Sequence, residues 1–301
     1  MASDPSRPPE PVPGSRHPGR PGSRQFSGLV RAGLASVLFL AASGVHVALA
    51  QSPRETLVFA GCDANIAVTR VLARAYMRKH PEMMVQLKTV GSTNGIALAA
   101  ARAVQLGLTS RPLRDAEEGL GLSYLPYATT AVVIGAAPDA SDTTLTADDL
   151  LSFYRGTKLQ WESGQEIVLL TREEGDSSVS SLSQVMPGFA EAYAAGSTTS
   201  HWTVLYSEPM MHEALLTFPF ALGLSDLGTV TLERLPIKVL SIDGVAPTLE
   251  NVASGRYPFT KTLGFVWRGG ALSESARSFV EFVQSAEGAA ILTSSGYVPV
   301  R

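Results

Sequence analysis

The chain lacks most of the residue patterns that mark an enzyme or a metalloprotein. It has one cysteine, Cys62, in 301 residues, so no intramolecular disulfide can form. Paired spacings typical of metal sites, such as His-x-x-x-His or Cys-x-x-Cys, do not occur. No Gly-x-Gly-x-x-Gly follows an expected strand, and no Gly-x-Ser-x-Gly is present. We therefore predict no metal, no cofactor and no catalytic residue.

One catalytic alternative remains open. Cys62 could pair with His80, His201 or His212 as a nucleophile. These histidines lie on different expected segments, and no motif places any of them beside the cysteine. We favour a structural cysteine at the end of the first strand.

The chain also has few charged residues, and fewer of them are basic than acidic. Charged residues make up 17% of the sequence, and the formal net charge is −3. Without residues 1–50, which hold five arginines and two acidic residues, 19 basic and 25 acidic residues remain, a net charge of −6. This balance argues against a nucleic-acid partner. A small anion stays compatible with it, because a few buried donors act locally.

The first fifty residues differ from the rest. A Pro-, Gly- and Arg-rich stretch is followed by an apolar run, residues 34–49, that ends in an Ala-x-Ala sequence at Ala50. This order is typical of a secretory signal peptide, and we expect translation to start near Val30 and cleavage to occur near Ala50. A membrane anchor is the alternative, although small residues and His46 make the run less hydrophobic than most spans. We expect a periplasmic or secreted protein.

Strands and helices are expected to alternate through the mature chain. This spacing predicts an α/β protein with doubly wound parallel sheets, whose ligands bind beyond the carboxyl ends of the strands. The expected strands are 56–60, 84–90, 106–109, 128–136, 166–170, 220–224, 237–240 and 257–267, and the expected helices are 65–79, 96–104, 147–154, 179–186, 274–285 and 286–294.

Two of these strands, 128–136 and 257–267, are long and bracket a middle segment. They predict two lobes joined by a two-strand hinge. We expect lobe 1 to comprise residues 51–128 with 258–301, and lobe 2 to comprise residues 129–257.

Three short polar loops run directly into expected helices: residues 61–65, 91–95 and 172–178. A helix N-terminus presents unpaired N–H groups and the positive end of the dipole, so it favours an anion. One such loop is common. Three, together with an arginine and several hydroxyls, indicate a cleft for a small oxyanion.

In order along the chain, these loops and several further motifs resemble the periplasmic phosphate-binding subunits of ABC transporters. The resemblance covers nearly all of residues 55–301. Its carriers are the Gly61 loop, Gly91-Ser92-Thr93-Asn94-Gly95, Thr109-Ser110-Arg111-Pro112-Leu113, Tyr154-Arg155-Gly156 with Trp161, the 172–178 loop, Pro247–Val252 with Tyr257-Pro258, and Ser285–Gly288 with Gly296–Pro299. It implies a two-lobed, type II periplasmic-binding-protein fold that holds an anion between the lobes.

The resemblance also implies which residues bind the ligand. The first lobe would supply hydroxyls and backbone N–H groups, and Arg172 would supply the cation from the second lobe. The expected set is Cys62, Asp63, Ser92, Thr93, Ser110, Arg111, Arg172, Asp176, Ser177 and Ser178. Two alternatives stay open: a surface salt bridge of Arg172 with Glu173 and Glu174, and a plain helix N-cap for Ser92 and Thr93.

The sequence departs from the family pattern at three of these positions. The family loop usually reads Arg-x-x-Gly-Ser-Gly-Thr, whereas Asp176 here stands where the serine is expected. Cys62 replaces a Ser or Thr, and Arg111 stands at or beside a position where phosphate binders often have an acidic residue. One hypothesis is a salt bridge between Arg111 and Asp176 that closes the cleft. A second is a ligand other than phosphate, and a third makes Asp176 only a helix N-cap.

The resemblance implies an ABC permease as partner, and we expect a monomer. Two other functions remain open: a binder of another oxyanion or an organic acid that serves signalling, and an enzyme that processes phosphoesters.

Overall fold

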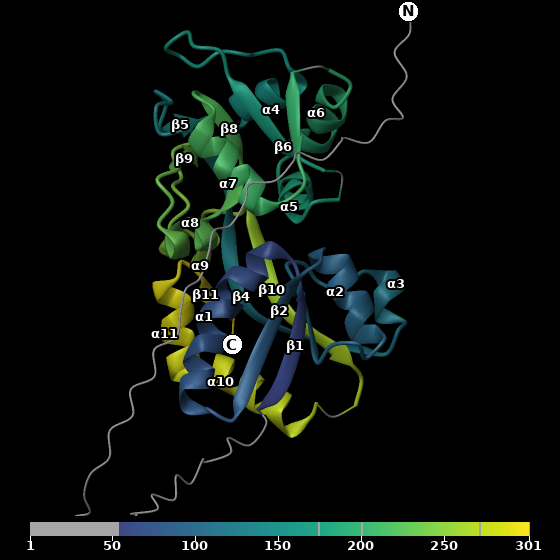
Figure 1. Ribbon diagram of the computed structural model, residues 1–301. Coiled ribbons are helices and arrows are strands. Elements are labelled where there is room, and N and C mark those ends of the chain that lie inside the picture. Colours follow the sequence, from purple (N-terminus) through teal and green to yellow (C-terminus); the bar gives the residue numbers. More distant parts are fainter. Residues whose placement is uncertain (1–53, 174, 200, 271, 301) are drawn as a thin grey trace, which may run out of the picture. The chain divides into compact units, whose positions relative to one another are not determined.

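The structure is a computed structural model that describes residues 54–173, 175–199, 201–270 and 272–300. The expected signal peptide and its cleavage near Ala50 lie outside these residues. Within them, no helix has both the length and the apolar character needed to cross a membrane. Figure 1 shows the arrangement of the helices and strands.

The strands form one mixed sheet in the order β2-β1-β3-β10-β4-β8-β6-β7, with β9 and β11 also paired to β4 and β5 paired to β9. The strands are β1 (Glu55–Gly61), β2 (Met83–Thr89), β3 (Leu106–Thr109), β4 (Leu122–Ala136), β5 (Thr144–Leu145), β6 (Val168–Arg172), β7 (Trp202–Leu205), β8 (Ala221–Asp226), β9 (Lys238–Ile242), β10 (Thr260–Arg268) and β11 (Val298–Pro299). The helices are α1 (Asp63–Lys79), α2 (Gly91–Ala100), α3 (Asp115–Glu118), α4 (Ala147–Arg155), α5 (Ser177–Val185), α6 (Phe189–Gly196), α7 (Glu208–Thr217), α8 (Leu227–Glu233), α9 (Leu249–Ala253), α10 (Glu274–Gln284) and α11 (Ala286–Ser294).

The long strand β4 belongs to both halves of the sheet. Its residues from Leu122 to Ala131 pair with β10, and those from Val132 to Ala136 pair with β8. We call β1, β2, β3, β10 and the start of β4 the first half, and the end of β4 with β5 to β9 the second half. Parallel pairing is confirmed among β1, β2 and β3 and among β6, β7 and β8. The strands β4 and β10 run antiparallel to each other and to their other neighbours in the sheet.

Helices cover both faces of the first half. Alternate residues of β1 point to opposite faces, as the two-residue period of a strand requires. Leu57 and Phe59 belong to a buried cluster that includes residues of α1, α10 and α11, whereas Ala60 packs with Ile96 of α2 on the other face. This two-sided burial explains why β1 is apolar almost throughout.

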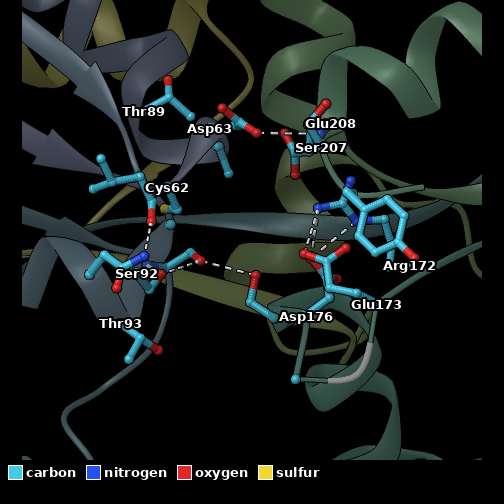
Figure 2. Close-up of a pocket in the computed structure, with 18 of the residues that line it drawn as sticks. Cys62, Asp63, Thr89, Ser92, Thr93, Arg172, Glu173, Asp176, Ser207 and Glu208 are labelled. Carbon is cyan, nitrogen blue, oxygen red and sulfur yellow. Dashed lines mark hydrogen bonds and ion pairs between the residues drawn. The ribbon is translucent and has the colours of Figure 1, made fainter. Parts of the chain in front are cut away.

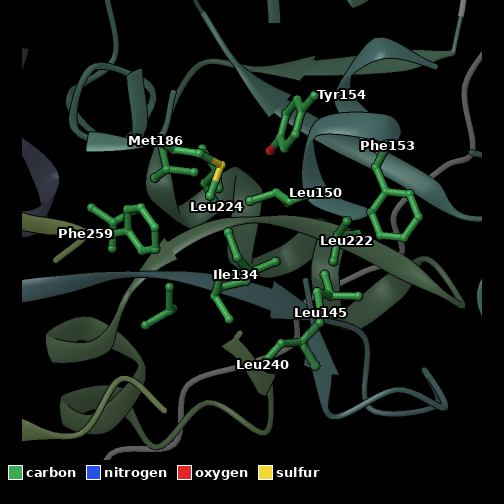
Figure 3. Packing of buried hydrophobic residues seen from close by; sticks show 14 of the residues in the cluster. Ile134, Leu145, Leu150, Phe153, Tyr154, Met186, Leu222, Leu224, Leu240 and Phe259 are labelled. Atoms are coloured by element: carbon green, nitrogen blue, oxygen red, sulfur yellow. The ribbon is translucent and has the colours of Figure 1, made fainter. Parts of the chain in front are cut away.

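The second half has its own buried cluster, shown in Figure 3. Ile134 of β4 and Leu222 and Leu224 of β8 pack there with Leu150 of α4. Thr146 caps the helix that was expected at 147–154, because its side chain accepts a hydrogen bond from the Asp149 N–H.

Several elements that the sequence did not predict lie in the second half, among them β7 and the helices α6 to α9. The strand β7 is short and largely exposed, so it lacks the apolar run that identifies a buried strand. In the first half, the helix expected at 96–104 instead begins at Gly91, directly after β2.

Candidate anion-binding site

A pocket of about 410 Å³ lies beyond the carboxyl ends of five strands. Its lining comes from the loops that follow β1, β2, β3, β6 and β7, and Figure 2 shows these side chains. This is the place where α/β sheets bind ligands. The lining residues are Cys62, Asp63, Ala64, Thr89, Val90, Gly91, Ser92, Thr93, Asn94, Ser110, Arg111, Arg172, Glu173, Gly175, Asp176, Ser177, Tyr206, Ser207 and Glu208.

Nine of the ten residues expected to bind ligand line this pocket. The exception is Ser178, which is buried and donates its backbone N–H to Asp176 Oδ1. The structure therefore brings the three polar loops together, and the binding role of each residue stays a prediction.

Close backbone packing fixes the first loop. A Cβ atom at Gly61 would lie 1.9 Å from the Leu108 carbonyl oxygen, so only glycine fits where β1 meets β3. The next residue, Cys62, donates its N–H to that same carbonyl at 3.2 Å and precedes α1. Burial raises the pKa of the Cys62 thiol, although hydrogen bonding to Ser110 opposes this. The thiol therefore stays neutral near pH 7 and adds no negative charge to the pocket.

Ser92 and Thr93 do not cap their helix, so that alternative is wrong. The N-cap of α2 is Val90, and it makes no side-chain cap hydrogen bond. Ser92 Oγ instead accepts the backbone N–H of Ser110 at 3.2 Å, and Thr93 Oγ1 accepts from Arg111 Nη2 at 3.3 Å. Both hydroxyl oxygens therefore accept hydrogen bonds from the loop that follows β3.

Arg111 is paired within the first half of the sheet. Its two terminal nitrogens each donate to a carboxylate oxygen of Glu117 at 2.7 Å, a two-point contact that lowers the pKa of Glu117. The hypothesis that Arg111 pairs with Asp176 across the pocket is therefore wrong in this structure. Because Glu117 holds both ends of the guanidinium, Arg111 presents little free charge.

Arg172 is the buried cation of the second half. It ends β6, is 7% exposed, and donates through Nε to Asp176 Oδ2 at 3.3 Å. Its Nη2 lies 3.2 Å from that oxygen and 3.6 Å from Glu173 Oε1. Nη1 is buried and has no hydrogen-bond partner among the described residues. The ion pair with Glu173 that the sequence left open is therefore present, but Arg172 is buried and does not lie at the surface, and Glu174 lies outside the described residues.

Asp176 has two structural roles. Its side chain accepts the N–H groups of Ser178 and Val179, which makes it the N-cap of α5. It also binds Arg172 and lines the pocket, so its side chain does not turn away from the site.

Two hydrogen bonds connect the halves across the pocket. Ser110 Oγ donates to Ser177 Oγ at 3.0 Å, and the Glu208 N–H donates to Asp63 Oδ2 at 3.4 Å. Ser92 Oγ lies 3.3 Å from Ser110 Oγ. Since the Ser110 proton goes to Ser177, Ser92 is the donor in this second contact. The chain of hydroxyls leaves the Ser177 proton available to a ligand.

A buried charge cluster below the pocket was missed by sequence reasoning. Glu208 Oε1 lies 3.0 Å from Lys261 Nζ, and both side chains are almost fully buried. Burial disfavours the charged carboxylate, but attraction to Lys261 outweighs it and lowers the pKa of Glu208 to about 2. Burial and the neighbouring Glu208 raise the pKa of Asp226 above its ordinary value. The signal was a single charged residue, Lys261, in the otherwise uncharged segment 257–267.

No described residues support a metal or Cys–His site. No group of three or more metal-ligating side chains occurs in residues 54–300, outside the three single-residue gaps at 174, 200 and 271. The His212 ring contacts Ser225 at 2.7 Å, and burial lowers its pKa. The side chains and backbone groups that influence the Cys62 pKa belong to Ser110, Asn65, Ser92 and Lys261, and none of these residues is a histidine.

Comparison with known families identifies the chain's relatives. A PBP superfamily domain matches residues 47–287. The chain belongs to the PBP superfamily. Among curated proteins in this comparison, the phosphate-binding protein PstS of Bacillus subtilis is 27% identical over 253 residues, which is 81% of each chain. Phosphate-binding protein PstS 2 of Streptococcus agalactiae is 28% identical over 138 residues, 44% of this chain and 46% of the relative.

Solved structures of other PBP-like proteins share the fold. A candidate phosphate ABC transporter substrate-binding protein with bound phosphate, from Clostridium perfringens, aligns with a TM-score of 0.74 at 22% identity, covering 82% of this chain and 100% of the other. An ABC-type phosphate transport receptor from Vibrio cholerae aligns with a TM-score of 0.61 at 23% identity, covering 80% and 99%. The expected family resemblance and the type II fold class are thus confirmed.

Proposed function

We propose that this PBP superfamily member is an exported solute-binding protein that captures phosphate or a similar oxyanion in the pocket, for an ABC transporter. The observation that carries the proposal is Arg172 Nη1, a buried cationic donor without a partner among the described residues. A buried charged donor left unpaired is strongly unfavourable, so such a group in a pocket indicates a ligand that completes it.

The neutral donors around Arg172 fit an oxyanion. The Ser177 hydroxyl has a proton to give, and the N-terminus of α2 opens into the same pocket with Gly91, Ser92 and Thr93 in its lining. Backbone N–H groups in the first turn of a helix have no helical partner and bind anions well. A ligand there would receive one charged hydrogen bond and several neutral ones.

Capture would proceed by closure of two lobes, residues 51–128 with 258–301 and residues 129–257. The strand β4, which belongs to both halves, and the start of β10 beside it would act as the hinge. Contacts across the pocket, such as the hydrogen bond from Ser110 to Ser177, would be lost on opening of the lobes and would form again on closure. A ligand that contacts both sides would therefore favour the closed state, because its affinity for that state is higher.

Relatives support the choice of ligand and partner. The matching curated proteins are named phosphate-binding proteins, and two structural neighbours are described as parts of phosphate ABC transport systems. By analogy, the mature chain would be a periplasmic or secreted monomer that docks on a permease and performs no catalysis. The signalling binder and the phosphoester enzyme remain alternatives that a ligand panel and a hydrolysis assay would detect.

Calorimetric titration of residues 51–301 with phosphate tests the proposal. The protein would first be unfolded and refolded to remove endogenous ligand. We expect saturable binding at micromolar concentration or below, and a gain of about 2.7 kcal/mol in unfolding free energy at 100 times the dissociation constant. Absence of heat from natively folded protein, with phosphate and with a panel of other oxyanions, would refute oxyanion capture.

A further inference from the structure

The guanidinium of Arg172 is fixed by a carboxylate of its own loop. Asp176 Oδ2 accepts a hydrogen bond from Nε at 3.3 Å and lies 3.2 Å from Nη2, and Nη1 has no partner among the described residues. These contacts hold only the end of a long side chain. The position of that end also depends on the main chain of Arg172, where β6 ends and the polar loop begins.

A second contact fixes the main chain of Arg172. Tyr193 of α6 donates its hydroxyl proton to the carbonyl oxygen of Arg172. The same hydroxyl oxygen accepts a hydrogen bond from Thr171 Oγ1 at 2.7 Å. One phenol group therefore binds the last two residues of β6, although Tyr193 itself is not among the residues that line the pocket.

The ring of Tyr193 packs in an aromatic cluster. Its centroid lies 4.7 Å from that of Trp202 and 5.8 Å from that of Tyr154. Gly196, one turn further along α6, permits this close packing, since a Cβ atom there would lie 1.9 Å from the Tyr154 carbonyl oxygen. A ring packed in this way has little freedom to move, so its hydroxyl is a fixed donor.

The hydroxyl of Tyr193 also keeps its proton. Burial raises the pKa of Tyr193, and the Asp176 carboxylate acts in the same direction. Because the ordinary pKa of a tyrosine is about 10, the hydroxyl is protonated throughout the neutral range. Its single proton goes to the Arg172 carbonyl, and its oxygen is left to accept from Thr171.

We propose that Tyr193 is a positioning residue for the oxyanion site, because its hydroxyl fixes the main chain of Arg172 while Asp176 fixes the guanidinium. The inference rests on the proposed function, since it takes Arg172 as the residue that binds the anion. A donor that is already in place need not be ordered when the ligand arrives, so the ligand binds more tightly. Loss of the hydroxyl would let the end of β6 shift, and a small shift is enough to weaken a directional hydrogen bond.

Tyr193→Phe tests the inference, because it keeps the ring and removes only the hydroxyl. We expect calorimetry to show about tenfold weaker phosphate binding by the folded variant. Tyr154→Phe is the matched control. It removes one hydroxyl from a neighbouring ring of the same cluster, and Tyr154 Oη has no hydrogen-bond partner among the described residues, so phosphate affinity should stay at the wild-type value. Unchanged affinity in the Tyr193 variant, or equal losses in the two variants, would overturn the inference.

Thr171→Val offers a second route to the same test. It removes the hydrogen bond that orients the Tyr193 hydroxyl and keeps the branched shape of the side chain. We expect about threefold weaker phosphate binding, a smaller effect because the hydroxyl itself remains. An affinity equal to that of wild type would count against the role of the hydroxyl.

A double-mutant cycle separates positioning from a purely structural role. If Tyr193 acts through Arg172, Tyr193→Phe should change phosphate affinity less than about twofold in the Arg172→Ala background. Similar losses in both backgrounds would mean that the hydroxyl acts independently of Arg172, and would contradict the assigned role. Chemical denaturation of each protein in the cycle verifies that it is folded under the conditions of the titration.

The two proposals fail in different ways. If Arg172→Ala weakens phosphate binding and Tyr193→Phe does not, oxyanion capture stands and the positioning role falls. If the wild-type protein does not bind phosphate, or if Arg172→Ala binds it as tightly as wild type, the assignment of Arg172 falls and the role of Tyr193 falls with it.

Discussion

The two sides of the pocket use their polar residues differently. On the side of the first half, Ser92, Thr93 and Ser110 present hydroxyls, and the local cation, Arg111, is held by Glu117. On the side of the second half, Arg172 keeps one terminal nitrogen without a partner among the described residues. Recognition of the ligand's charge is therefore concentrated on the side of the second half. An arginine in a binding loop contributes to ligand affinity only where its nitrogens are not already bound by a neighbouring carboxylate.

The largest effect is expected on stability, from the cluster that supports the second side. Lys261→Met would leave the Glu208 carboxylate buried without its cation, and we expect a loss of about 3–5 kcal/mol in unfolding free energy. Lys158→Met is the matched control, because it breaks a partly exposed pair with Asp149 and should cost less than about 1 kcal/mol. Similar losses in the two variants by chemical denaturation would show that the buried pair is unimportant.

The same cluster predicts an acid dependence of stability. The folded pKa of Glu208 is about 2, below its ordinary value of 4.5. A lowered carboxyl pKa contributes stability that is fully present above the unfolded pKa and is lost as pH falls towards the folded pKa. The stability gained from Glu208 should therefore disappear between about pH 4.5 and pH 2, by a few kcal/mol. Glu208→Gln, measured by denaturation across this range, should flatten the profile, and a profile parallel to wild type would be inconsistent with this account.

Substituting the two arginines compares the two sides directly. Arg172→Ala should weaken phosphate binding about a hundredfold, because it removes the charged donor of the pocket that has no partner among the described residues. Arg111→Ala should weaken it less than about threefold, because Glu117 already occupies that guanidinium. Calorimetry on both variants measures the difference. Equal losses of phosphate affinity in the two variants, or a larger loss in the Arg111 variant, would contradict the conclusion that the second half supplies the charged donor.

Removing the charge of Asp176 should strengthen phosphate binding. Asp176→Asn keeps an oxygen that can cap α5 but frees Nε and Nη2 of Arg172 from a carboxylate. We expect inorganic phosphate to bind about tenfold more tightly, the effect of one lost repulsive charge in a partly buried site. Weaker binding by the folded variant would mean that Asp176 positions Arg172 more than it opposes the ligand.

The smallest effect concerns the hydroxyl contact between the halves. The hydroxyls of Ser92, Ser110 and Ser177 are hydrogen-bonded in that order, and Ser177→Ala removes the hydroxyl proton that is left for the ligand. We expect about a fivefold loss of phosphate affinity, near 1 kcal/mol. Ser183→Ala, on the same helix and bonded only to the carbonyl of Val179, is the control and should change little. An unchanged affinity in the Ser177 variant would exclude its hydroxyl from the site.

Local patterns in the sequence were enough to predict the alternation of strands and helices and the meeting of three polar loops. Glycine and hydroxyl residues at strand ends, as at 61–65 and 91–95, report turns and helix starts that form from neighbouring residues. The strand β7 is short and largely exposed and has no apolar run, so it was missed together with Tyr206 and Glu208 after it. The helix α7 did carry a signal, the cap residue Ser207 followed by Met211, Ala214 and Leu215 at helical spacing.

Charge partners were harder to predict, because they depend on contacts outside the local pattern. The hypothesis that paired Arg111 with Asp176 followed from two departures from a family pattern. The structure instead pairs Arg111 with Glu117, six residues along the chain, and Asp176 with Arg172, four residues before it. Lys261 meets Glu208 only through the fold, since 53 residues separate them.

A crystal structure of the protein with bound phosphate would show directly whether Arg172 holds the anion. We predict a phosphate oxygen about 2.7–2.9 Å from Arg172 Nη1, the length of a charge-assisted hydrogen bond, with Arg111 still paired to Glu117. Phosphate bound instead to Arg111, or at a place that Arg172 does not reach, would contradict it.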